Sequence, residues 1–245
     1  MQAASPDLSP ENAVRSASNH FAAARLRGNE AFREGKYYEA IECYTNALDA
    51  ASVLESAQEP ERQGAPPLDQ AIVRCNRAAA YLKLAENAKR QVEKTEAPND
   101  GEKGDTRGTQ IESEWSKLLR SAAEDSNAAM ELLDGIPSEH KTERSTELRI
   151  KALHRRMRAN AGLGKFADAA KDANELASLR PEYGPEAERF TREAAAANER
   201  EKQEAIEKLK EVGNSFLSLF GMSLENFQTK RNPDGTFSVS YSPKG

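Results

Sequence analysis

The chain has 245 residues, of which 38% are hydrophobic and 31% are charged, and its mean hydropathy is −0.80. This length allows one medium-sized domain or a series of small repeated units, but so charged a chain has to build its core economically, and we expect some segments to be disordered. The 35 basic and 40 acidic residues give a net charge of −5, which argues against general nucleic-acid binding.

Membrane and secretory features are also missing from the sequence pattern. No apolar run approaches the roughly 18 residues that span a bilayer, and the first residues lack the continuous apolar region of a secretory signal. The two cysteines, Cys43 and Cys75, lie in alanine-rich helical patterns, which is typical of small buried residues in a reducing compartment rather than of a disulfide. We therefore expect a cytoplasmic protein with no membrane partner.

The first predicted structural unit follows an N-terminal stretch, residues 1–18, that we expect to be disordered. Residues 21–54 show the pattern of two helices joined by a turn at Gly35. The second of these helices carries small and aromatic side chains on one face: Tyr37, Ala40, Tyr44 and Ala47. Small residues allow two antiparallel helices to approach closely, and aromatic ones fill the gaps between neighbouring pairs.

The same unit recurs further along the chain. Residues 150–182 repeat the turn glycine and the helix face of the first unit, with Gly164, Phe166, Ala169 and Ala173 at the corresponding positions. Residues 71–134 contain a third copy, interrupted at 87–112 by a charged insertion that we expect to be a mobile loop. The insertion is either a regulatory segment or a tolerated addition, and its sequence does not distinguish the two.

After the third unit, the chain changes character twice. Residues 183–213 are rich in alanine and in glutamate–lysine neighbours, which predicts a long helix that caps the repeats. Residues 214–245 combine an apolar cluster with the turn sequence Asn232–Gly235 and an alternating strand pattern at Phe237, Val239 and Tyr241, which predicts a hairpin.

The repeated pattern of small and aromatic residues resembles the tetratricopeptide repeat family, whose unit has about 34 residues. The resemblance implies an all-α fold, an α-α superhelix of three helix pairs over residues 19–182, followed by the capping helix and a short β-hairpin-like tail. The C-terminal sequence is also similar to the end of one member of this family.

Five polar residues fall on the predicted first helices of the three units, which line the concave surface of such a superhelix. They are Arg25, Asn29, Asn76, Lys151 and Arg155. Arginine and lysine supply charge and asparagine supplies directional N–H groups, so that the set could hold two carboxylates. In this order the residues resemble the dicarboxylate clamp of co-chaperones in this family, with Arg25 where the family has lysine. The resemblance implies binding of the C-terminal Glu-Glu-Val-Asp tails of cytosolic heat-shock chaperones of the seventy- or ninety-kilodalton class.

The apolar tail offers a second candidate site. Its aromatic and large apolar residues include Phe216, Phe220, Met222 and Phe227. One hypothesis is that these residues dock a client or second protein, and the alternative is that they pack on their own domain.

Catalytic and metal-binding patterns are not found. His20, His140 and His154 lie in unrelated segments, and the sequence has no nucleophile elbow, phosphate loop or metal-ligand spacing. We therefore expect a monomeric interaction protein that is not an enzyme and needs no cofactor. Its predicted function is that of a co-chaperone adaptor, and the alternative is a scaffold that binds another protein independently of chaperones.

Overall fold

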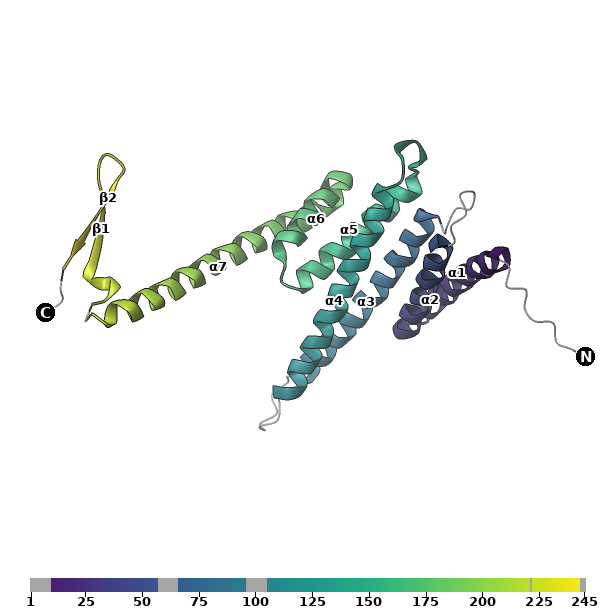
Figure 1. Cartoon of the computed structure of the whole chain (residues 1–245), viewed down its shortest axis with the longest axis horizontal. Helices are drawn as coiled ribbons and strands as arrows, with labels where there is room; N and C mark the ends of the chain where they lie inside the picture. Colours follow the sequence, from purple (N-terminus) through teal and green to yellow (C-terminus); the bar gives the residue numbers. More distant parts are fainter. Residues whose placement is uncertain (1–9, 57–65, 96–104, 221, 243–245) are drawn as a thin grey trace, which may run out of the picture. The chain divides into compact units, whose positions relative to one another are not determined.

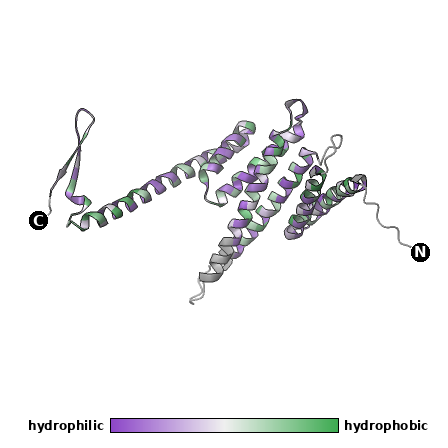
Figure 2. Cartoon of the chain, in the orientation of Figure 1, coloured by the Kyte–Doolittle hydropathy of each residue, from purple (hydrophilic) through white to green (hydrophobic). Residues whose placement is uncertain are grey.

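The computed structural model describes residues 10–56, 66–95, 105–220 and 222–242, and is almost entirely helical (Figure 1). The chain divides into two compact units, Met1–Thr191 and Arg192–Gly245. None of the described helices is both long and apolar enough to cross a membrane, and hydrophilic and hydrophobic residues are mixed along α7 (Figure 2).

The described part of the first unit consists of three antiparallel helix pairs and the start of a seventh helix. The helices are α1 (Pro10–Arg33), α2 (Tyr37–Ser56), α3 (Pro67–Thr95), α4 (Asp105–Asp134), α5 (Glu143–Gly162), α6 (Phe166–Leu179) and α7 (Gly184–Ser218). Short 3-10 turns, Ser138–His140 and Pro181–Tyr183, precede α5 and α7. Each helix packs on its partner, and α3 also contacts α1, α2 and α5. The expected all-α architecture of stacked helix pairs is confirmed.

Glycine turns close the first and third pairs, as the sequence predicts. Gly35 and Gly164 have φ values of 78° and 73°, a left-handed conformation that other residues adopt only with strain. Between the paired helices the predicted small residues are buried: Ala40, Ala169 and Ala173 are fully inaccessible. Gly28 of α1 is needed for a close approach, because a Cβ atom there would lie 2.6 Å from Cε1 of Tyr44 in α2.

Two predictions about irregular segments are wrong where the structure describes them. Helix α1 begins at Pro10, so residues 10–18 are helical rather than disordered, and residues 1–9 lie outside the described residues. Within the expected loop at 87–112, α3 continues to Thr95 and α4 begins at Asp105, while residues 96–104 are not described. Proline is well suited to the first turn of a helix, and a charged sequence can extend a helix that is already nucleated by packing.

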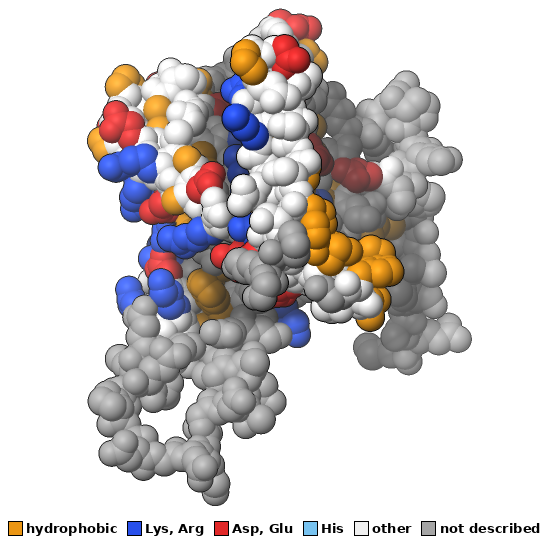
Figure 3. Space-filling model, turned by 90° about the vertical axis from the view of Figure 1, so that its left-hand side faces the viewer, with side chains coloured by type: hydrophobic (Ala, Val, Ile, Leu, Met, Phe, Trp, Pro, Cys, Tyr) orange, Lys and Arg blue, Asp and Glu red, His pale blue; other side chains and the backbone are white. Residues whose placement is uncertain are grey.

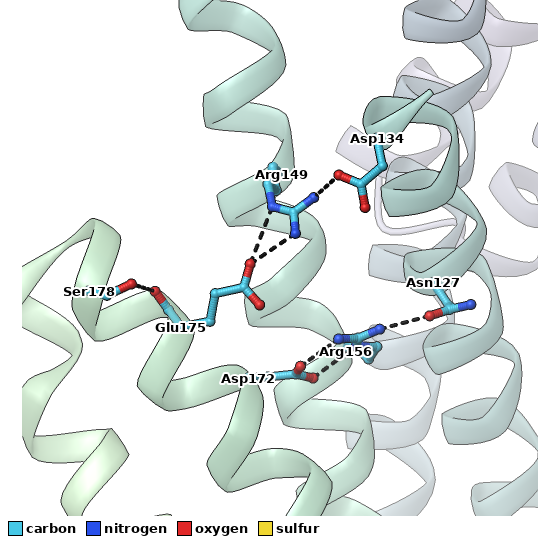
Figure 4. A network of polar contacts seen from close by, with 7 residues as sticks. All are labelled: Asn127, Asp134, Arg149, Arg156, Asp172, Glu175 and Ser178. Atoms are coloured by element: carbon cyan, nitrogen blue, oxygen red, sulfur yellow. Dashed lines mark hydrogen bonds and ion pairs between the residues drawn. The ribbon is translucent and has the colours of Figure 1, made fainter. Parts of the chain in front are cut away.

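Ion pairs, some buried and some exposed, connect α5 to the helices on either side of it. In Figure 4, Arg156 of α5 donates to both carboxylate oxygens of Asp172 in α6, at 2.6 and 2.9 Å, and to Asn127 of α4 at 2.7 Å. Arg149, two turns earlier on α5, contacts Asp134 of α4 and Glu175 of α6. Helix α5 is therefore tied to both of its neighbours.

The second unit contains the rest of α7, a 3-10 turn (Leu224–Asn226) and two strands, β1 (Phe227–Arg231) and β2 (Phe237–Tyr241). The strands are antiparallel, with Phe227 opposite Tyr241 and Arg231 opposite Phe237. Gly235, at φ 86°, lies in the turn between them. The predicted hairpin is thus confirmed. Helix α7 continues to Ser218, beyond the expected end of the capping helix at residue 213.

Candidate functional site

A groove with a volume of about 390 Å³ opens between the first helices of the three pairs. Its lining residues come from α1, α2, α3 and α5: Asn29, Phe32, Arg33, Tyr44, Asn76, Ala79 and Arg155. The groove brings together three of the five residues predicted from the sequence, namely Asn29, Asn76 and Arg155.

Asn29 is held in a fixed orientation at the centre of the groove. Its side-chain oxygen accepts one hydrogen bond from the Tyr44 hydroxyl at 2.9 Å and another from Nδ2 of Asn76 at 3.0 Å. Burial raises the pKa of Tyr44 to about 12, so the hydroxyl stays protonated and keeps donating at neutral pH. Because its oxygen is occupied, Asn29 can offer a ligand only its N–H donors.

Two arginines supply positive charge to the same groove. Nη1 of Arg155 is buried and donates to no group in the described part of the chain. Arg33 donates through Nε to the backbone oxygen of Asn29 at 3.2 Å, and this bond leaves its two terminal nitrogens for other partners. The combination of guanidinium and amide donors is suited to an anion with several oxygens, such as a carboxylate.

Burial raises the pKa of the Cys75 thiol, which is fully inaccessible, and the positive charge of Arg155 partly opposes this rise. Cys75 therefore stays a neutral residue behind the groove and adds no negative charge to it. Cys43 and Cys75 are both free; Cys75 is buried as the sequence predicts, but Cys43 is only half-buried.

The other two predicted residues do not line the groove. Arg25 lies one helical turn before Asn29, and its Nη1 is paired with Oδ1 of Asp69 in α3 at 2.6 Å. Lys151 lies one turn before Arg155 on α5 and is exposed to solvent. The structure therefore places one of the predicted positive charges in an internal ion pair.

Four residues that line the groove were not predicted from the sequence: Phe32, Arg33, Tyr44 and Ala79. Arg33 could have been found, because Arg25, Asn29 and Arg33 are spaced by four residues and share one helix face. Tyr44 was assigned to the packing between helices, and only its hydroxyl, which reaches Asn29, connects it to the groove.

The second candidate site is partly exposed. Phe216 in the last turn of α7 and Phe220 just after the helix are 62% and 64% exposed, and their rings lie 5.5 Å apart. Met222 is half-buried, and Phe227 packs on Tyr241 across the hairpin with a centroid distance of 5.3 Å. The four residues therefore do not form one continuous surface of equal exposure.

Charged side chains of both signs are mixed on one face of the molecule. On the face drawn in Figure 3, Lys and Arg side chains (blue) lie among Asp and Glu side chains (red). Among the described residues, no group of three or more histidine, cysteine, aspartate or glutamate side chains could hold a metal ion.

Stacked antiparallel helix pairs, with small residues between the helices and a groove along the first helix of each pair, form a helical-repeat architecture. The chain matches no protein-family model. Among solved structures it is similar to the first TPR domain of Spaghetti (RPAP3) bound to the HSP90 peptide SRMEEVD, with 25% identity over 73% of this chain and 98% of that one and a TM-score of 0.42. It is also similar to the first TPR domain of human RPAP3, with 23% identity over 73% of this chain and 95% of that one and a TM-score of 0.42.

Proposed function

We propose that this protein is an adaptor that binds the acidic C-terminal tail of a cytosolic heat-shock chaperone in the groove between α1, α3 and α5. The observation that carries the proposal is the convergence of Asn29, Asn76 and Arg155 on one groove, with Nη1 of Arg155 buried and lacking a hydrogen-bond partner among the described residues. A buried donor without a partner is costly, and a carboxylate oxygen from a ligand would satisfy it.

A C-terminal aspartate fits this chemistry because it carries two carboxylates on one residue. Arg155 and Arg33 can neutralise the charge, while the N–H groups of Asn29 and Asn76 fix the direction of approach. Lys151 is exposed one turn from Arg155, where it can add long-range attraction. The five residues resemble the co-chaperone clamp, which binds tails ending in Glu-Glu-Val-Asp. We therefore propose a tail of this class as the ligand.

Isothermal titration of the full chain with an acetylated Met-Glu-Glu-Val-Asp peptide tests the proposal. We expect a Kd of about 1 μM, equivalent to about −8 kcal/mol, with affinity that falls as salt rises. Arg155→Ala should weaken binding at least tenfold, because it removes a charge-assisted contact worth about 1.5–3 kcal/mol. Arg144→Ala, which removes an exposed arginine near the start of the same helix, is the matched control and should bind normally.

The same peptide with an amidated C-terminus serves as a ligand control. It lacks the terminal carboxylate and should bind at least tenfold more weakly than the free acid if the groove holds two carboxylates. Equal affinity for both peptides, or no binding at about 1 mM, would contradict the proposal and leave a scaffold that recognises another protein.

A further inference from the structure

A stripe of exposed apolar residues runs along the C-terminal half of α7. It consists of Leu209, Val212 and Phe216 of α7 and of Leu219 in the turn directly after the helix; we call this set the α7 stripe, and its members are 73%, 68%, 62% and 78% exposed. Isolated exposed apolar residues are common on protein surfaces, but three on one helix face followed at once by a fourth are not. Ile206 and Phe220, also exposed, flank the stripe and widen it.

The spacing of the α7 stripe is informative. Its members are separated by three, four and three residues, which is the alternation of the two core positions in a heptad repeat. A helix with this pattern packs best against another helix with the same pattern, because the side chains of each fill the gaps of the other. The pattern therefore points to a helical partner with a matching stripe.

The described part of the first unit provides no such partner. Its exposed large hydrophobic residues are single ones on different helix positions: Leu26, Tyr38, Val53 and Leu179. The hairpin presents Phe237, Val239 and Tyr241, but these follow the two-residue period of a strand rather than a heptad. Among the described residues, the sequence that matches the α7 stripe is the α7 stripe itself.

We propose that the α7 stripe pairs with the α7 stripe of a second copy of this chain, so that the protein forms a homodimer through a short two-helix coiled coil. The heptad positions that flank the stripe favour this pairing, because Lys208 is the single charged residue among them. These positions are Ile206, Lys208, Gly213, Ser215 and Phe220. Little like-charge repulsion arises when two such helices meet. The sequence alone led us to expect a monomer.

The size of the surface is sufficient for a weak dimer. The four stripe residues with Ile206 and Phe220 are between 45% and 78% exposed, so each can lose a large part of its accessible surface on pairing. Standard protein interfaces bury about 800 Å² per partner. Since the coiled coil is only about two heptads long, we expect the dimer to dissociate in the range of about 1–50 μM.

Sedimentation velocity of the full chain between about 1 and 100 μM tests this proposal. We expect a concentration-dependent shift from monomer to dimer. The double variant L209Q/F216Q should remain a monomer over the whole range, because glutamine removes the apolar contact while keeping good helix propensity. The control E207Q/E211Q places the same residue type on the opposite face of the same helix and should dimerise like the unchanged chain. Circular dichroism checks that both variants keep their helical content.

Two results would overturn the proposal. A monomer at every concentration would mean that the stripe is covered within the chain, for instance by the hairpin, or is reserved for another partner. A dimer that persists unchanged in L209Q/F216Q would show that the copies meet elsewhere. The proposal does not depend on the peptide groove, so neither result bears on peptide binding.

Discussion

Arg25 shows how an internal contact can occupy a residue that the sequence predicts to bind a ligand. The sequence places it first among the five residues predicted to form a clamp, but its guanidinium is paired with the Asp69 carboxylate at 2.6 Å. The side chains of the pair are 27% and 34% exposed, so water can reach both of them. A peptide carboxylate that reached Arg25 would have to compete with Asp69 for the same donors.

Removing the competitor should therefore strengthen binding. We predict that Asp69→Asn raises the affinity for the acidic peptide about 2- to 5-fold, because a solvent-accessible ion pair contributes about 0.2–1 kcal/mol. Titration calorimetry measures the change. The control Asp49→Asn removes the same charge from α2 outside the groove. If both variants gain equally, general electrostatics explains the effect and Asp69 has no special role.

His154 makes the stability of the third helix pair sensitive to acid. It lies on α5 with its ring 5.5 Å from that of Tyr183, and burial lowers its pKa from the ordinary value of 6.5, with Glu186 partly opposing the shift. When the pKa of a histidine is lower in the folded state, protonation of that histidine favours the unfolded state. Its contribution to stability is present above about pH 6.5 and is lost as pH falls through the lowered pKa.

We predict that the free energy of unfolding drops less between pH 7.5 and pH 5.0 in His154→Gln than in the unchanged chain. Urea denaturation followed by the fluorescence of Trp115, the single tryptophan, measures the difference. His140→Gln, which replaces an exposed histidine, is the control and should keep the pH dependence of the unchanged chain. A pH dependence that His154→Gln leaves intact would assign the acid sensitivity to carboxylates elsewhere.

Part of the site could be predicted from the sequence and part could not. Asn29, Asn76 and Arg155 could be placed on one surface because the repeat register fixes which helix face each one occupies. The Arg25–Asp69 pair could not be predicted, since it depends on the distance between α1 and α3. Helix periodicity within a single element carries no information about that distance.

At the scale of elements, the same ion pair occurs in two successive repeats. Arg77 of α3 donates to both carboxylate oxygens of Asp125 in α4 and to Thr45 of the preceding pair, as Arg156 of α5 does to Asp172 and Asn127. Each arginine follows directly on a groove residue, Asn76 or Arg155. The pairs thus hold the first helices in place directly behind the groove.

Breaking one of these ion pairs should lower the free energy of unfolding strongly. The Asp172 side chain is only 2% exposed, so Arg156→Met would leave a buried carboxylate without its counter-ion and lower the free energy of unfolding by about 3–5 kcal/mol. Arg149→Met is the control on the same helix, because its partners Asp134 and Glu175 are 56% and 35% exposed, and its loss should be about 1 kcal/mol or less. Urea denaturation measures both, and similar losses in the two variants would contradict the argument.

Helices, strands and turns could be predicted where the residues of a short segment determine its conformation. The turns at Gly35 and Gly164 and the hairpin turn ending at Gly235 were found because each needs a backbone conformation that glycine favours. The helical parts of the 87–112 insertion and of residues 10–18 were missed. Their composition is typical of disorder, but a helix already packed over its apolar half can extend through a charged sequence at little cost per residue.

At the scale of the whole molecule, the groove and the α7 stripe have different consequences for binding. In the proposed function, the groove determines the affinity of one chain for one peptide. If the α7 stripe joins two chains, the resulting dimer carries two grooves. A heat-shock chaperone that displays two tails would then meet a bivalent adaptor, and linked binding events gain strength through a high effective concentration without any new contact.

This difference leads to a prediction about dissociation kinetics. On a surface densely coated with the acidic peptide, the unchanged chain at about 20 μM should dissociate at least tenfold more slowly than L209Q/F216Q, because both grooves of a dimer must release together. In solution, where each peptide binds one groove, the two proteins should show the same Kd. Surface plasmon resonance at high and low peptide density measures the first effect and titration calorimetry the second. The slow phase should disappear at low density and persist in E207Q/E211Q. Equal dissociation of all three proteins at high density would mean that the two grooves of a dimer cannot engage the surface at once.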